Sequence, residues 1–167
     1  IGIGGVDPRN GQPYTYIETI AGGEGGKPWS DGTDGVQCNM TNTMNTPVEA
    51  LEITYPLRVE CYEFRKGTGG AGKYRGGLGV TRSVRAIGHE ARVSLSAERR
   101  LLPPYGLYGG EAGEVGAHFS LDKGGQLKES RAPCLDNYPI NASKSSRTPN
   151  TVSTARNRDY AYTVFFN

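Results

Sequence analysis

Polar side chains that can bind an anion or an amide are concentrated between residues 31 and 58. Carboxylate, amide and hydroxyl groups alternate there with glycines, which let the backbone turn sharply. Side chains of this kind also bond to the backbone of tight loops, so composition alone favours a structural turn. The candidate catalytic residues, which we expect to line or brace a reaction cleft, are Asp31, Asp34, Asn42, Thr43, Asn45 and Glu49.

A short helix is predicted to follow this polar segment. Thr46 is expected at the N-cap and Pro47 at the first helical position, where its missing N–H costs nothing. Glu49 then stands three residues after Thr46 and completes a capping box. An ordered polar loop that leads into the positive end of a helix can bind an anion or an amide.

Residues 67–73 match the first seven positions of the G-x-x-x-x-G-K phosphate loop, but the eighth is Tyr74 instead of Ser or Thr. Residues 75–79 contain three glycines and would form a poor helix, although the motif requires one. We therefore expect a connection between strands. The cations expected to hold a phosphate or a carboxylate, or else to be solvated, are Arg58, Lys73 and Arg75.

Apolar residues recur mostly with a period of two, which is typical of half-buried strands. Residues 91–97 show the cleanest alternation, and residues 57–62 repeat it. Two further strands are predicted at 80–86, interrupted by Arg82, and at 14–20. We expect a mainly β (α+β) fold, with twisted antiparallel sheets, long Gly-rich loops and one or two short helices.

The composition changes near residue 125. All 25 glycines precede Gln126, and the following residues are polar with scattered prolines. We expect residues 1–125 to form a domain and residues 126–167 to be a Gly-free tail, poorly ordered or divergent. The apolar residues at 160–166 could form a last strand that docks on the main body. Because the 167 residues begin at Ile1 without a methionine, we interpret the chain as a piece of a longer polypeptide.

Charge and cysteine content argue against several functions. A net charge of +2 with interleaved signs disfavours nucleic acid, and no apolar run approaches the ~20 residues that span a bilayer. Cys38, Cys61 and Cys134 form no CxxC pair, which together with the lack of a visible signal peptide favours a cytoplasmic location. His89 and His118 have no partners at metal-ligand spacing, so no metal site is predicted here.

Several short sequence segments occur in a fixed order that composition alone does not explain. They are residues 4–9, 16–23, 31–36, 40–43, 45–49, 55–59, 69–79 and 103–110. This series resembles the C-terminal part of the hydantoinase B family, over roughly residues 4–125. That family includes N-methylhydantoinase B-type subunits, the matching half of 5-oxoprolinase, and subunits of acetone and acetophenone carboxylases.

The resemblance implies a fragment of the B-type subunit of an ATP-dependent cyclic-amide hydrolase, which opens hydantoin or 5-oxoproline rings. A hydantoinase A-type subunit or domain would bind ATP and Mg and phosphorylate the carbonyl oxygen of the substrate. Two alternatives stay open: the equivalent piece of an ATP-dependent acetone- or acetophenone-type carboxylase, and a non-catalytic subunit-assembly module.

The chain also departs from the family pattern. Gln37 and Asn39 stand where histidines usually follow Asp-Gly-Val, and the Gly-free tail replaces a glycine-rich ending. A shifted reading frame, a truncated product or divergence would explain that tail. The His- and Asp-rich motifs, which could hold a divalent metal, belong to the N-terminal region of the family. We therefore expect the isolated fragment to be inactive.

Overall fold

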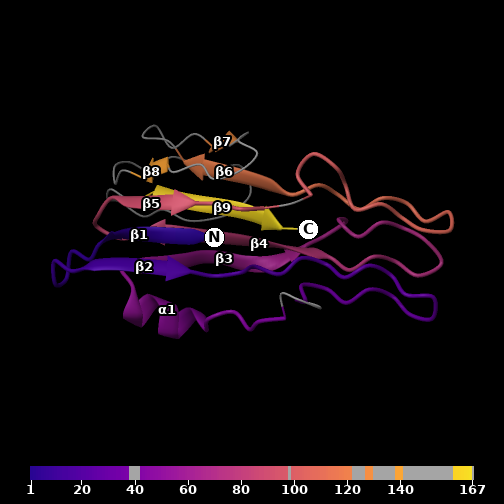
Figure 1. Ribbon diagram of the computed structural model, residues 1–167, viewed down its shortest axis with the longest axis horizontal. Helices are drawn as coiled ribbons and strands as arrows, with labels where there is room; N and C mark the ends of the chain where they lie inside the picture. The colour runs from indigo at the N-terminus through magenta and orange to yellow at the C-terminus, as the bar shows by residue number, and fades with distance from the viewer. Residues whose placement is uncertain (38–41, 98, 122–126, 130–137, 141–159, 167) are drawn as a thin grey trace.

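The computed structural model describes residues 1–37, 42–97, 99–121, 127–129, 138–140 and 160–166. These residues form two antiparallel sheets and one short helix, so the expected mainly β fold is confirmed (Figure 1). In spatial order, the first sheet contains β2 (Pro13–Ile17), β1 (Gly2–Val6), β5 (Ala91–Ser94) and β8 (Tyr138–Ile140). The second contains β3 (Leu57–Arg65), β4 (Gly79–Ala86), β9 (Tyr160–Phe166), β6 (Ala117–Leu121) and β7 (Leu127–Glu129).

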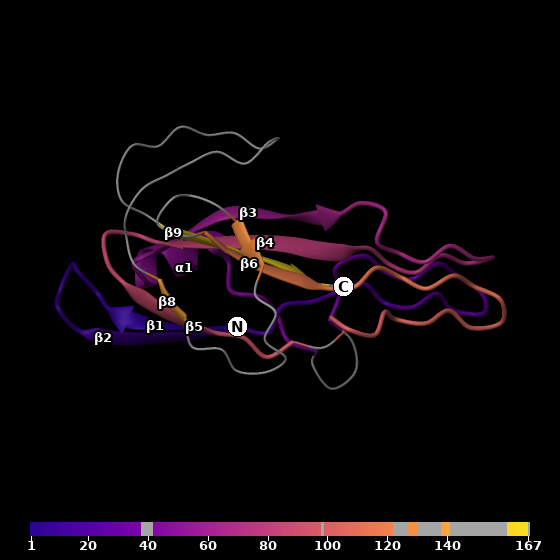
Figure 2. The same cartoon turned by 90° about the horizontal axis from the view of Figure 1, so that it is seen from above.

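The hydrophobic core lies between the two sheets, which form the two layers seen in Figure 2. Ile3 and Val93 contribute from the first sheet, and Leu57 and Val84 from the second. The helix α1 (Val48–Thr54) closes one side next to β2 and β3, and its Leu51 is fully buried. This arrangement follows from the period-two alternation, because every second residue of each strand faces the opposite layer.

All four predicted strands are present, with shifted boundaries. β5 ends at Ser94, earlier than expected, whereas β3 continues to Arg65. The alternation did not reveal β1, because its sequence Gly-Ile-Gly-Gly-Val offers few side chains to compare. β1 nevertheless pairs with β2 on one side and β5 on the other, and it is a central strand of its sheet.

The predicted capping box of α1 is wrong. Pro47, not Thr46, stands at the N-cap, and its carbonyl accepts the first helical hydrogen bond from Leu51 N at 3.0 Å. The N–H of Thr46 donates instead to Glu18 Oε1 at 2.7 Å. A carboxylate that directly follows β2 therefore takes the donor that Glu49 was expected to satisfy, and Glu49 is exposed.

The expected strand at 160–166 exists and is central rather than peripheral. β9 pairs with β4 on one side and with β6 on the other, in antiparallel register. The division of the chain at residue 125 stays a prediction, because most of residues 126–167 lie outside the described part. The three strands described there, β7, β8 and β9, all join sheets of the main body.

Three long loops, residues 20–36, 66–78 and 99–116, extend together from one end of the sheets (Figure 1). We call them the loop platform. Backbone hydrogen bonds join them, including Gly77 N to Glu24 O at 2.7 Å and Glu111 N to Ala71 O at 2.7 Å. A Cβ on Gly77 would lie 2.1 Å from the carbonyl oxygen of Thr33, so glycine is required for this contact.

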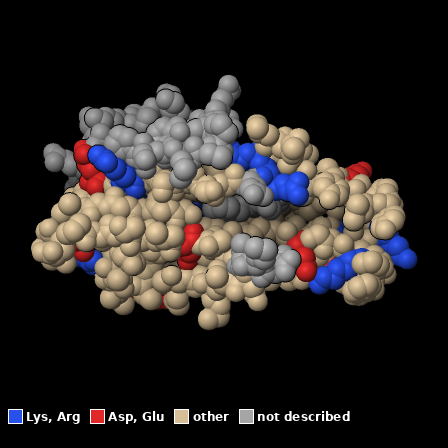
Figure 3. All heavy atoms as spheres, in the orientation of Figure 1, with Lys and Arg blue, Asp and Glu red and all other residues tan. Residues whose placement is uncertain are grey.

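The loop platform also explains the glycines that resemble a phosphate loop. A Cβ on Gly69 would lie 2.1 Å from Gly76 O, and one on Gly70 would lie 2.2 Å from Glu111 O. This segment is thus packed against other backbone, and the next element is β4 rather than a helix. On the face shown in Figure 3, the described acidic and basic side chains are interspersed.

Candidate functional site

A buried ion pair lies between the two sheets. Glu18 follows β2, and Arg82 lies in the middle of β4; their Oε2 and Nη2 atoms are 3.0 Å apart, with side chains 4% and 2% exposed. The Tyr16 hydroxyl donates to the same carboxylate oxygen. Burial, together with this hydrogen bond, raises the pKa of Tyr16 well above its usual range, so the phenol remains a donor. The guanidinium carbon of Arg82 lies 4.7 Å from the centroid of the Tyr62 ring.

The ion pair is connected to the polar segment that the sequence singled out. We refer to residues 42–46 as the polar loop. The N–H of Thr46 donates to Glu18 Oε1 at 2.7 Å, and Asn45 Nδ2 donates to Thr19 O at 2.8 Å. The Tyr62 hydroxyl donates to Asn45 Oδ1 at 3.1 Å. Both ends of the Asn45 amide are therefore fixed, one by the segment after β2 and one by β3.

Gln37 fixes the polar loop from its other side. Gln37 Nε2 donates to Thr19 O at 2.7 Å, and its Oε1 accepts the Thr43 hydroxyl at 3.0 Å. Asn42 and Met44 remain exposed, and Met44 exposes 96% of its surface. The hydrogen bonds of Thr43, Asn45 and Thr46 thus hold the polar loop in place. The amide of Asn42 is left exposed at the surface.

Asp31, Asp34 and Arg75 come together in a second group, within the loop platform. Asp34 accepts two hydrogen bonds from the Arg75 guanidinium, at 2.8 and 3.2 Å, and a third from Leu78 N at 2.8 Å. Asp31 Oδ1 accepts the backbone N–H of Arg75 at 2.9 Å. The guanidinium holds the pKa of Asp34 below its usual range. This group braces two loops, and the planar fork of Arg75 is already occupied by Asp34.

The remaining candidates take no part in the hydrogen bonds and ion pairs of either group among the described residues. Glu49 is exposed on α1, and Arg58 is exposed on β3. Lys73 is exposed in the loop platform, with its Nζ 5.4 Å from the centroid of the Tyr74 ring. Among the described residues, the predicted site residues therefore form two hydrogen-bonded groups, and Glu49, Arg58 and Lys73 belong to neither; whether they share one cleft stays a prediction.

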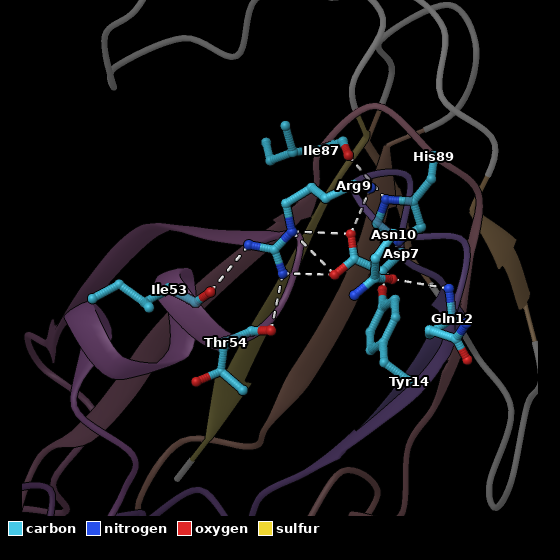
Figure 4. A network of polar contacts seen from close by, with 9 residues as sticks. All are labelled: Asp7, Arg9, Asn10, Gln12, Tyr14, Ile53, Thr54, Ile87 and His89. Atoms are coloured by element: carbon cyan, nitrogen blue, oxygen red, sulfur yellow. Dashed lines mark hydrogen bonds and ion pairs between the residues drawn. The ribbon is translucent and has the colours of Figure 1, made fainter.

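A third polar network attaches the end of α1 to the first sheet (Figure 4). Arg9 donates to both carboxylate oxygens of Asp7, and also to the carbonyls of Ile53 and Thr54 at 3.0 and 2.9 Å. Those carbonyls lie at the C-terminal end of the helix and have no hydrogen-bond partners within it. The guanidinium supplies these partners, and its positive charge interacts favourably with the negative end of the helix dipole. The hydrogen bond from Arg9 lowers the pKa of Asp7.

The neighbouring Tyr14 and His89 complete this network. The Tyr14 hydroxyl lies 2.6 Å from His89 Nε2, and His89 Nδ1 lies 2.9 Å from Ile87 O. A carbonyl only accepts, so Nδ1 carries the proton and Nε2 accepts from Tyr14. Burial raises the pKa of Tyr14 to about 12, which keeps the hydroxyl protonated. His89 therefore joins the turn before β5 to β2, which is a structural role.

Glu18 and Arg82 were not selected from the sequence, although a signal was present. Arg82 stands on the strand face that carries Val80 and Val84, and Glu18 continues the face that carries Tyr16. Two opposite charges at buried positions of two strands indicate a pair across the core.

The described residues contain no group of three or more His, Cys, Asp or Glu that could hold a metal ion. The helix among them, α1, has 7 residues and is too short to cross a bilayer.

Comparison with known proteins gives consistent results. The Hydantoinase B/oxoprolinase family model matches residues 1–158. The 5-oxoprolinase of Dictyostelium discoideum is 45% identical over 111 residues, which are 66% of this chain and 9% of that protein. 5-oxoprolinase 1 of Arabidopsis thaliana is 41% identical over the same shares of the two chains. A candidate B-type subunit of a D-/L-hydantoinase from Pseudomonas sp. is 36% identical over 62% of this chain and 17% of its own length.

Two solved structures share the fold. They are nucleotide-free acetone carboxylase and the ATP-dependent caprolactamase of Pseudomonas jessenii, each with a TM-score of 0.67 at 16% identity. The first match covers 99% of this chain and 24% of the carboxylase chain, and the second covers 98% and 27%. The chain spans about 9% of the length of the 5-oxoprolinases it matches. It belongs to the Hydantoinase B/oxoprolinase family.

Proposed function

We propose that this chain is part of the B-type subunit or domain of an ATP-dependent enzyme that opens cyclic amides. The observation that carries the proposal is family membership over residues 1–158, together with relatives at 45% and 41% identity that are named 5-oxoprolinase. Hydantoins and 5-oxoproline are the proposed substrates, because both are small rings closed by an amide bond.

The chemistry requires two steps because the oxygen of an amide is a poor leaving group. In the first step, an A-type partner transfers a phosphoryl group from ATP to the carbonyl oxygen, which makes the carbon electrophilic. In the second, water attacks that carbon and the C–N bond of the ring breaks, which leaves an acyl phosphate; a second water then attacks the acyl carbon, forms the carboxylate and releases phosphate with the original oxygen. Nucleotide and Mg are assigned to the partner, because the Gly-rich segment 67–73 is packed against backbone and no helix follows it among the residues up to β4.

Within this chain, the polar loop is the proposed contact with the cyclic amide. An amide side chain can donate to the substrate carbonyl and accept from its ring N–H, and Asn42 is exposed for this purpose. Thr43 and Asn45 would brace it through Gln37 and Thr19. Asp31, Asp34 and Glu49 are proposed to line or brace the reaction cleft. Arg58, Lys73 and Arg75 are the proposed phosphate contacts, and Arg75 would have to leave Asp34 to act.

The lengths of the relatives support a two-part enzyme. The aligned stretch is 9% of the Dictyostelium 5-oxoprolinase and 17% of the Pseudomonas protein. Since the two alignments have similar lengths, 111 and 104 residues, the first protein is roughly twice as long as the second. An A-type partner that is fused in one relative and separate in the other would account for this difference.

The test uses the parent polypeptide that contains this chain, together with its A-type partner. Ring opening of 5-oxoproline and of hydantoins is measured with ATP and Mg, with and without bicarbonate. We expect turnover that requires ATP and is independent of bicarbonate. Turnover that requires bicarbonate would replace the hydrolase with the carboxylase. Binding to the partner without any turnover would indicate an assembly module, and would contradict the proposal.

A further inference from the structure

Glu18 joins three parts of the chain that are distant in sequence. Its carboxylate, just after β2, accepts from Arg82 Nη2 in β4 at 3.0 Å and from the Thr46 N–H at the entrance to α1 at 2.7 Å. It also accepts from the Tyr16 hydroxyl. One buried carboxylate therefore fixes the distance between the core of the sandwich and the polar loop.

Stability alone does not account for this ion pair. Arg82 is 2% exposed, and among the described residues its Nε and Nη1 atoms have no hydrogen-bond partner. Its neighbours on the same strand face are Val80 and Val84, which are buried apolar residues. Desolvating two charges and leaving donors unfilled is costly, and apolar replacements of such pairs are often neutral or stabilising. A pair that carries this cost is better explained by the geometry that it imposes.

We propose that Glu18 and Arg82 are positioning residues, which hold the polar loop in the conformation that presents Asn42 to the cyclic amide. The inference rests on the proposed function for its catalytic consequence. Arg82 orients the carboxylate through Oε2, which leaves Oε1 aimed at the Thr46 N–H. The hydrogen bond from the Asn45 side chain to the Thr19 carbonyl then links the residue after Glu18 to the polar loop.

The first measurement needs no activity. Amide hydrogen exchange of a peptide covering residues 42–50 is compared between the 167-residue chain and its E18L/R82L variant. We expect exchange at least about tenfold faster in the variant, because the Thr46 N–H loses its acceptor. The matched control is E60Q/R85M, which removes the partly exposed pair between β3 and β4 with a 3.3 Å separation. Its loop peptide should exchange as in the unsubstituted chain.

The single variant E18Q keeps the test decisive if E18L/R82L does not fold. Gln retains a carbonyl oxygen for the Thr46 N–H but loses its charge, so Arg82 no longer fixes its orientation. Exchange in E18Q should lie between that of the unsubstituted chain and that expected without the acceptor. Unchanged exchange of the loop peptide in the folded variants would overturn the inference, whatever the complex catalyses.

The second measurement connects position with turnover, in the parent polypeptide with its partner. Asn42→Ala should lower kcat about tenfold or more in the unsubstituted background, and less than about twofold in the E18L/R82L background. Equal factors in both backgrounds would show that the pair does not act through the loop. If the unsubstituted complex opens no cyclic amide, the proposed function fails, and the exchange result still decides whether the pair positions the loop.

Discussion

Asp34 stabilises two loops at once, because a single carboxylate accepts from the Arg75 guanidinium and from the Leu78 backbone N–H. These bonds favour its charged form, so its pKa in the folded chain lies below that of the unfolded chain. Its stabilising contribution is therefore complete above the unfolded pKa of ~3.9 and is lost as the pH falls through the lower folded value.

The Asp34→Asn variant tests this linkage. The free energy of unfolding should be lower than in the unsubstituted chain at pH 7, and the difference should shrink as the pH falls from about 5 to below 3. Denaturant unfolding across this pH range measures it. Glu114→Gln, which changes an exposed carboxylate in the same platform, is the control and should change the free energy of unfolding at pH 7 by less than about 0.5 kcal/mol. A constant difference at every pH would contradict the assigned ion pair.

At the residue scale, the sequence predicted which side chains form hydrogen bonds within turns. It did not predict which side chains from distant parts of the chain contact one another. Asn45 and Thr43 were selected because they stand in a turn, and the structure gives both of them hydrogen-bond partners. Glu18 and Arg82 were missed because each has its partner on a strand far away in the sequence, which no local pattern specifies. Only opposite charges on apolar strand faces indicated the pair.

At the scale of elements, the strands with clean alternation were predictable and the exceptions have physical causes. β5 and β3 follow the period of two, whereas β1 has too few side chains to show it. The N-cap of α1 was misplaced because a distant carboxylate satisfies the Thr46 N–H. The loop platform was predicted only as Gly-rich connections, because its packing depends on contacts between three separate loops.

The platform makes a sharp prediction about two glycines. Gly77→Ala should lower the free energy of unfolding by about 1–3 kcal/mol, because its Cβ would lie 2.1 Å from Thr33 O and one loop must move. Gly25→Ala, where a Cβ would meet nothing within 4 Å, is the matched control and should change stability by less than about 0.5 kcal/mol. Equal effects in denaturant unfolding would show that the loops are not in close contact.

At the scale of the whole molecule, the second sheet is built from both halves of the chain. β3 and β4 come from the middle of the chain. β9, near the C-terminal end of the chain, lies between β4 and β6 in the sheet. Composition suggested a separate tail because residues after 125 lack glycine and apolar periodicity. Strand pairing depends on backbone groups as well as side chains, so a polar segment can end in a paired strand.

Truncation after residue 158 tests this architecture. Without β9, β4 and β6 lose their common partner, and both expose unpaired backbone edges. We expect Tm to fall by more than about 10 °C, which corresponds to a few kcal/mol for a chain of this size. Deletion of Asn167 alone is the control and should leave Tm unchanged. Equal melting of the two truncations would support the independent tail that composition suggested.

The proposed function depends most directly on the fate of the amide oxygen. The parent polypeptide and its A-type partner would be given ATP and a cyclic amide labelled with ¹⁸O at the carbonyl, and the released phosphate would be analysed by mass spectrometry. We expect one ¹⁸O in phosphate for each ring opened, with no label transferred when the parent polypeptide or ATP is omitted. Ring opening that proceeds without ATP would contradict the phosphorylation of the amide oxygen, and ring opening that leaves the label in the carboxylate product would contradict its departure with phosphate.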